Sequence, residues 1–247
     1  MKDTTQAILL VADISGYTQF LKMHAVSTNH AKQIVVRLLK ALIRASKPPL
    51  KVAELEGDAV FFYALSSAND IKATTERVKA QILKFFSAFN AEMSALMQTK
   101  LCVCDACTKV GELKLKQVVH LGEVAIERIE RFEKLFGLDV VVVHRMLKNS
   151  VPSHEYVMMT DPVYSNFVDF FGLEPERRTE QFEGVGEVDT LVFYASRLRQ
   201  TQPYVNAEAA SPSLLSKLGW ITKLVSQTLL DLVGLRKIKG AFNNLPA

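Results

Sequence analysis

The sequence has few of the features that mark secreted or membrane-spanning proteins. It contains only three cysteines in 247 residues, and an odd, clustered set of thiols is a poor basis for a disulfide framework. No stretch of 18 uncharged apolar residues occurs, so an ordinary transmembrane helix is not expected. The start lacks the long apolar segment and cleavage site of a signal peptide. We therefore expect a cytoplasmic protein.

Net charge is also scarce over most of the chain. The formal net charge is +4, and residues 211–247 contain five basic residues against one acidic residue. The charge of the whole chain is thus accounted for by this tail, and the rest is close to neutral. A near-neutral core gives no support for nucleic acid binding, and we expect no nucleic acid partner.

The hydrophobic content of 49% is enough for a sizeable buried core. We expect a domain over residues 1–196 with a cysteine-containing insertion near 101–113, a polar linker over 197–213, and a basic amphipathic helix over 214–247. This last helix could pack on its own domain or on a partner subunit. Alternatively, its basic residues could meet anionic lipid, making the protein peripheral to a membrane surface.

Hydrophobic periodicity predicts an α+β fold. A buried strand over 7–14 is followed by helical spacing to Ala45, a hairpin over 51–56 and 59–65, and a second helix that begins at Asn69-Asp70. A long strand over 114–126, a charged loop over 127–134 and helices at 138–149 and 161–168 come next. Strands at 156–159, 178–184 and 188–195 complete the chain. This order fits a ferredoxin-like βααββαβ core with added strands.

Two carboxylates occupy notable positions in this pattern. Asp13 closes the first apolar strand, and Asp58 follows Gly57 at the tip of the hairpin. Taken singly, Asp13 could cap a helix and Asp58 could be an ordinary turn residue. If they face one another, they repel unless a cation lies between them, and Mg²⁺ or Mn²⁺ is the natural occupant.

Four segments resemble the class III nucleotidyl cyclases, the adenylate and guanylate cyclase family. They are Asp13-Ile14-Ser15-Gly16-Tyr17-Thr18, Gly57-Asp58, His120-Leu121-Gly122-Glu123, and Gly137-Leu138-Asp139-Val140 followed by Arg145. They occur in the family order and span roughly residues 6–195. The resemblance implies a purine nucleotide cyclase, a phosphorus–oxygen lyase that uses GTP or ATP and acts as a homodimer.

The same resemblance implies roles for individual residues. Two Mg²⁺ or Mn²⁺ ions would be held by Asp13, Asp58 and the carbonyl of Ile14, and phosphate would lie against Gly16, Tyr17 and Thr18. Arg145 would be the catalytic residue that meets the transition-state phosphate. Glu54, four residues before Asp58, would contact the base and favours guanine. The other base position is Lys134, which could instead form an ion pair with Glu54.

Two positions depart from the family pattern. Val141 stands where the family has the Asn that orients the ribose, and Glu183 stands where it has a Lys that contacts phosphate. Loss of one preorganised electrostatic group typically lowers the rate about 10²–10³-fold. We therefore expect weak cyclase activity or none. The alternatives are a catalytically inactive regulatory or dimerisation module and one half of a heterodimeric cyclase.

The three cysteines lie outside the family pattern. Cys102, Cys104 and Cys107 could hold one Zn²⁺ ion, with His120, Asp105 or a cysteine of another chain as the fourth ligand. Free thiols in a surface loop, together with a structural histidine on a strand, are the alternative interpretation.

Overall fold

The fold is built around a long central strand, β1 (Thr5–Ser15). The computed structural model describes residues 4–21, 25–67, 69–98, 109–202 and 222. Residues 7–12 of β1 are fully buried. A nearly continuous aliphatic strand is what a sheet covered on both faces requires.

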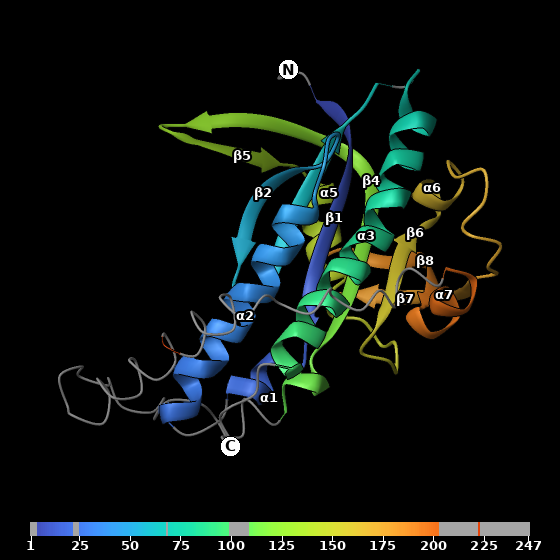
Figure 1. Ribbon diagram of the computed structural model, residues 1–247. Helices are drawn as coiled ribbons and strands as arrows, with labels where there is room; N and C mark the ends of the chain where they lie inside the picture. The colour runs from blue at the N-terminus through green and yellow to red at the C-terminus, as the bar shows by residue number, and fades with distance from the viewer. Residues whose placement is uncertain (1–3, 22–24, 68, 99–108, 203–221, 223–247) are drawn as a thin grey trace.

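The described strands form a mostly antiparallel, eight-stranded sheet in the order β2-β3-β1-β4-β6-β8-β7, with β5 paired to the end of β4. The strands that flank β1 are β2 (Lys51–Glu56), β3 (Ala59–Leu65) and β4 (Lys114–Ile129). The others are β5 (Phe132–Phe136), β6 (Tyr156–Thr160), β7 (Glu176–Phe182) and β8 (Gly186–Tyr194). In Figure 1, the β4–β5 hairpin projects away from the body of the molecule.

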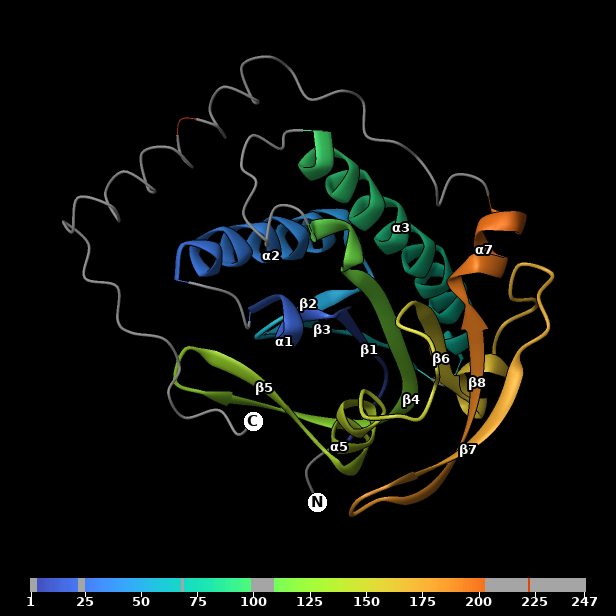
Figure 2. The same ribbon diagram turned by 90° about the horizontal axis from the view of Figure 1, so that it is seen from below.

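The two faces of the sheet are covered differently. The long helices α2 (Ala25–Ala45) and α3 (Ile71–Gln98) lie on one face, and the short helix α5 (Leu138–Arg145) lies on the other (Figure 2). Shorter elements are α1 (Tyr17–Leu21), the 3-10 helix η1 (Val110–Glu112), α6 (Asp161–Tyr164) and α7 (Ala195–Thr201). The sheet therefore separates two unequal layers.

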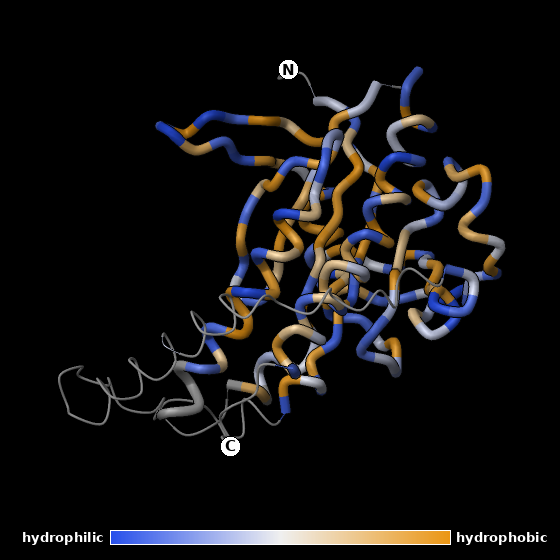
Figure 3. Tube along the Cα trace, in the orientation of Figure 1, coloured by the Kyte–Doolittle hydropathy of each residue, from blue (hydrophilic) through white to orange (hydrophobic). Residues whose placement is uncertain are grey.

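Alternation along the strands gives each face its own apolar core. Towards α2 and α3, the core includes the fully buried rings of Phe62, Phe85 and Phe86. Towards α5, a smaller cluster includes Phe61 and Val142. Apolar segments line the central strands in Figure 3.

The order β1-α1-α2-β2-β3-α3-β4 is the expected βααββαβ order. Four local expectations differ from the structure. Most of the predicted loop 127–134 is strand in the β4–β5 hairpin, and residues 197–201 belong to α7 instead of a linker. The predicted helices 138–149 and 161–168 are α-helical only through Arg145 and Tyr164. The cysteine segment and the predicted helix 214–247, apart from Thr222, lie outside the described residues.

Candidate functional site

The tip of the β2–β3 hairpin lies beside the end of β1. Asp13 is paired in register with Ala59, the residue after Asp58. The N–H of Ile14 donates to the carbonyl of Asp58 over 3.1 Å. The turn places Gly57 at φ +64°, a conformation that glycine adopts without strain. The backbone thus brings together the two acidic positions that the sequence singled out.

The surroundings of the two carboxylates change their pKa values. Burial, and then the negative charge of Asp13, raise the pKa of Asp58 to about 6. Burial also raises the pKa of Asp13, and the positive charge of Lys116 partly offsets this effect. Two half-buried acids, one of which raises the pKa of the other, form a site with excess negative charge.

Lys116 is the site residue that the sequence analysis missed. It lies opposite Asp13 in the β1–β4 register, and its Nζ is 3.1 Å from Asp13 Oδ2. The same Nζ donates to the backbone carbonyl of Leu147 over 3.2 Å. No local sequence pattern links Lys116 to Asp13, because the register between β1 and β4 is set only when the sheet forms.

The predicted phosphate-binding residues follow the acid pair directly. Gly16 follows the last residue of β1 at φ +91°, and its carbonyl accepts the N–H of Phe20 over 3.0 Å. The pKa of the Tyr17 hydroxyl is raised by burial and by the charge of Asp58. Gly16, Tyr17 and Thr18 therefore lie at the junction next to the acids, and Thr18 is exposed.

The donor chemistry near Asp13 suits a hard divalent cation. Asp13 and Asp58 supply carboxylate oxygens, the ligands that Mg²⁺ and Mn²⁺ prefer. Ser15 is two residues beyond Asp13 on the same face of β1, and its buried Oγ has no hydrogen-bond partner among the described residues. A bound cation would relieve the excess negative charge of the two acids.

The predicted base-contacting residues are joined to each other. Lys134 Nζ lies 2.5 Å from Glu54 Oε2, and each side chain is 45% exposed. This pair links β5 to β2, and a second link runs from Tyr63 to Glu133. The structure thus contains the ion pair that was one of the two interpretations of Glu54.

The predicted catalytic arginine also has a partner. Arg145 lies at the end of α5, and its guanidinium is 3.4 Å from Glu183 Oε2. Glu183 is the residue that stands in place of the family's lysine, and its side chain is 89% exposed. Val141, one turn before Arg145, is exposed as well. The two departures from the family pattern and Arg145 therefore share one region of the surface.

His120 fastens α5 to the sheet. Its Nε2 lies 2.8 Å from Asp139 Oδ1, and its Nδ1 lies 3.0 Å from Thr160 Oγ1. The other Asp139 oxygen accepts the N–H of Glu123 over 2.7 Å. This carboxylate fills the space beside Gly122, where a Cβ would lie 2.1 Å from Asp139 Cγ.

These contacts bear on the predicted zinc site. Both ring nitrogens of His120 are engaged, so zinc binding would require it to give up one of these partners. Cys102, Cys104 and Cys107 lie outside the described residues. Within the described part of the chain, no three His, Cys, Asp or Glu side chains gather as a metal-binding cluster.

Among the same described residues, no helix is long and apolar enough to cross a membrane.

Solved structures with the same fold are class III cyclase-like proteins. A class III adenylyl cyclase-like ATP-binding protein from Pseudomonas aeruginosa matches with a TM-score of 0.56 at 18% identity, over 67% of this chain and 35% of that protein. The guanylyl cyclase Cya2 matches with a TM-score of 0.53 at 17% identity, over 77% of this chain and 92% of that one. This chain spans about a third of the first protein. At such identities the similarity establishes the fold alone.

Comparison of sequences identifies the family of the chain. Residues 35–156 match the family described as "Protein of unknown function (DUF2652)". The uncharacterized protein Rv2561/Rv2562 of Mycobacterium tuberculosis is 35% identical over 156 residues, which are 63% of this chain and 71% of that protein. With this identity and coverage, the chain belongs to the family of this mycobacterial protein.

Proposed function

We propose that this protein is a divergent nucleotidyl cyclase-like domain that binds a nucleoside triphosphate, GTP or ATP, together with Mg²⁺ or Mn²⁺. The observation that carries the proposal is the meeting of Asp13 and Asp58 at the end of β1 in a cyclase-like fold. The description of one structural relative as ATP-binding supports the same ligand class.

In this proposal, Asp13, Asp58 and the carbonyl of Ile14 hold the metal. When bound, the divalent ion neutralises negative charge on the phosphates. Gly16, Tyr17 and Thr18 follow the acids directly and would contact the phosphate chain. Their place at the strand–helix junction, next to the acid pair, supports this role.

Cyclase activity is expected to be weak or absent. Val141 offers no hydrogen bond to a ribose, and Glu183 brings negative charge to the surface that a triphosphate would approach. The ion pair with Glu183 also engages Arg145. Each lost electrostatic group typically lowers the rate of such a reaction by about 10²–10³-fold.

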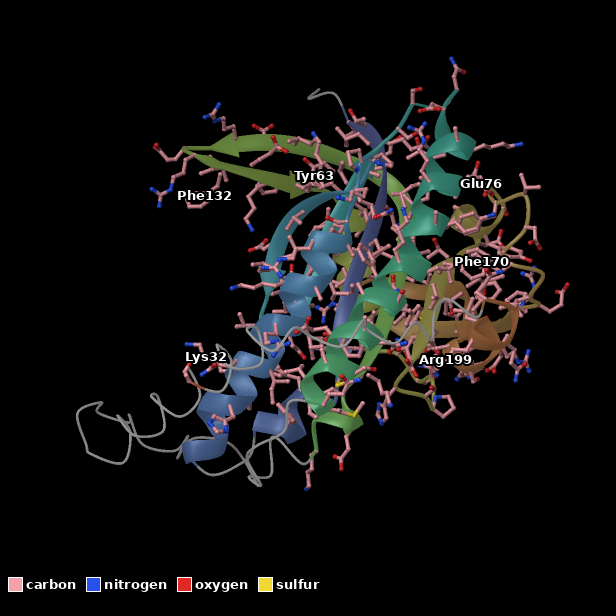
Figure 4. All side chains as sticks on the ribbon, viewed as in Figure 1. Lys32, Tyr63, Glu76, Phe132, Phe170 and Arg199 are labelled. Carbon is pink, nitrogen blue, oxygen red and sulfur yellow. The ribbon has the colours of Figure 1, made fainter. Side chains whose placement is uncertain are left out.

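We further propose that the protein acts as a homodimer. Large apolar side chains are exposed along the β4–β5 hairpin and α5, namely Ile129, Phe132, Phe136, Leu138 and Val141. Phe132 lies at the tip of the hairpin (Figure 4). Exposed apolar surface of this kind is typical of an interface, and a second copy would cover it. Sedimentation of the wild type and of Phe132→Ser over a range of concentrations tests this, with weaker association expected for the variant.

The decisive experiment for ligand binding is a thermal shift with GTP or ATP plus Mn²⁺. A ligand at about 100 times its Kd stabilises the folded state by about 2.7 kcal/mol. The shift should be present in the wild type and lost in Asp58→Asn. Cyclic product is then measured by mass spectrometry in the wild type and in Val141→Asn/Glu183→Lys. Both substitutions lie at exposed positions, and together they should raise the yield.

The second candidate is a catalytically inactive regulatory or dimerisation module. The Glu54–Lys134 pair favours it, because two side chains that satisfy each other have less to offer a purine base. The absence of a thermal shift with every nucleotide and metal would leave this function. A further version, one half of a heterodimeric cyclase, requires a partner chain whose coexpression restores activity.

A further inference from the structure

The Asp13–Asp58 site already contains a fixed positive charge. We propose that the ammonium of Lys116 is a built-in cation of this site, so that the site takes one divalent ion instead of the two expected from the cyclase resemblance. This inference rests on the proposed function, because it concerns the number of ions held with the nucleotide.

Two contacts from different elements hold the ammonium in place. Lys116 Nζ bonds to Asp13 Oδ2 of β1 and to the carbonyl of Leu147, which follows α5. The side chains of Lys116 and Asp13 are 19% and 15% exposed. By contrast, the side chain of Lys134 in its ion pair with Glu54 is 45% exposed. Movement of Lys116 into solvent would leave a largely buried carboxylate without its partner, which is costly.

The fixed charge of Lys116 weakens the attraction of the site for a second divalent ion. Asp13 and Asp58 carry two negative charges when ionised, a bound triphosphate adds about four, and Lys116 returns one positive charge. One divalent ion then leaves the group at about −3 and two leave it at about −1, and each sum would be one unit more negative without Lys116. The ammonium also repels a second ion directly, and this repulsion is stronger where the side chains are partly removed from water. No third carboxylate, His or Cys gathers with the pair among the described residues to offset that repulsion.

The oxygen donors left over fit a single ion. Lys116 occupies Asp13 Oδ2, so the other Asp13 oxygen, the Asp58 carboxylate and the carbonyl of Ile14 remain. The buried Ser15 Oγ, which lacks a partner among the described residues, is a further oxygen on the same face of β1. The ammonium then faces the phosphates as the second positive charge, in the role that a second metal would otherwise have.

The test counts Mn²⁺ ions bound per full-length chain, by electron paramagnetic resonance, with a non-hydrolysable GTP or ATP analogue. Lys116→Met removes the charge and keeps most of the side-chain length, and Lys116→Arg keeps the charge as the matched control. We expect one ion in the wild type and in Lys116→Arg. In Lys116→Met we expect a second ion, or an affinity for the first ion that is at least about tenfold higher.

Two ions in the wild type would overturn the inference and leave the proposed function standing. The same holds if Lys116→Met binds Mn²⁺ with the count and affinity of the wild type. If none of the proteins binds Mn²⁺, the proposed metal site fails together with the inference. The wild-type count is informative by itself, so the test survives even if Lys116→Met does not fold.

Discussion

The two faces of the sheet differ in the helices that cover them and in the polarity of their side chains. The face under α2 and α3 is closed by two long helices over a core of aromatic and aliphatic side chains. In the described part of the chain, the opposite face is covered by the short helix α5, and charged or polar groups such as Asp13, Lys116 and His120 lie among its apolar residues. The contrast indicates that one face mainly stabilises the fold and the other carries the candidate chemistry.

The largest expected loss of stability is for a substitution in the core under α2 and α3. Phe62→Ala removes a fully buried ring that stacks on Phe85 with centroids 4.8 Å apart. Loss of such a ring should lower the free energy of unfolding by about 3–5 kcal/mol, as measured by urea denaturation. Val168→Ala is the control, because that apolar side chain is 89% exposed and lies outside the proposed dimer surface. Equal losses for the two variants would remove the basis for the comparison.

On the other face, His120→Ala should be the most damaging polar substitution. It leaves Asp139 Oδ1 and the hydroxyl of the buried Thr160 without the partner that His120 supplies, and such losses cost about 1–3 kcal/mol. The same denaturation series should show almost no change for His154→Ala, which alters an exposed histidine. A loss below about 0.5 kcal/mol for His120→Ala would show that this histidine does not fasten α5.

Asp58→Asn should stabilise the metal-free protein in a pH-dependent manner. The pKa of Asp58 is about 6 in the folded state and close to 3.9 in an unfolded chain. The folded state therefore holds this proton more tightly, and the associated stability is present below pH 4 and lost as the pH rises through 6. Because solvent screens this half-buried group, we expect a gain of only about 1 kcal/mol for the variant at pH 8.

The measurement is urea denaturation in the presence of a chelator at pH 4 and pH 8. The stability difference between Asp58→Asn and the wild type should grow from the lower pH to the higher one. A difference that is constant with pH, or that shrinks as the pH rises, would mean that the acid pair does not carry excess negative charge.

The smallest effect on stability is expected for the exposed Glu54–Lys134 ion pair. Lys134→Ala breaks an ion pair whose two side chains are almost half exposed. Such pairs contribute about 0.2–1 kcal/mol, so the midpoint of urea denaturation should shift only slightly. Glu54→Ala and the double variant Glu54→Ala/Lys134→Ala complete the double-mutant cycle. A coupling energy above about 2 kcal/mol would mean that this ion pair contributes substantially to the stability of the fold, against the prediction.

Apolar periodicity was sufficient to predict the order of strands and helices in the core, because buried segments repeat with the period of their secondary structure. The β4–β5 hairpin was missed because it projects from the body, and its charged residues lack the alternation of a half-buried strand. Its exposed position explains why residues 127–134 resembled a loop in the sequence.

At the candidate site, the sequence predicted the acid pair because both acids lie at recognisable boundaries, one at a strand end and one in a Gly-Asp turn. It also offered the Glu54–Lys134 pair as one interpretation. Lys116 and the contact between Arg145 and Glu183 could not be predicted in the same way. Both depend on how distant segments are aligned in the folded sheet, which local patterns do not encode.

The absence of a side chain at Gly122 affects the position of a whole helix. The Asp139 carboxylate occupies the room that this hydrogen leaves, and through it the start of α5 is seated on β4. Val141 and Arg145 are carried on the same helix. The geometry of the surface that would meet a nucleotide or a second subunit is therefore decided, in part, by a methyl group that is missing from a neighbouring strand.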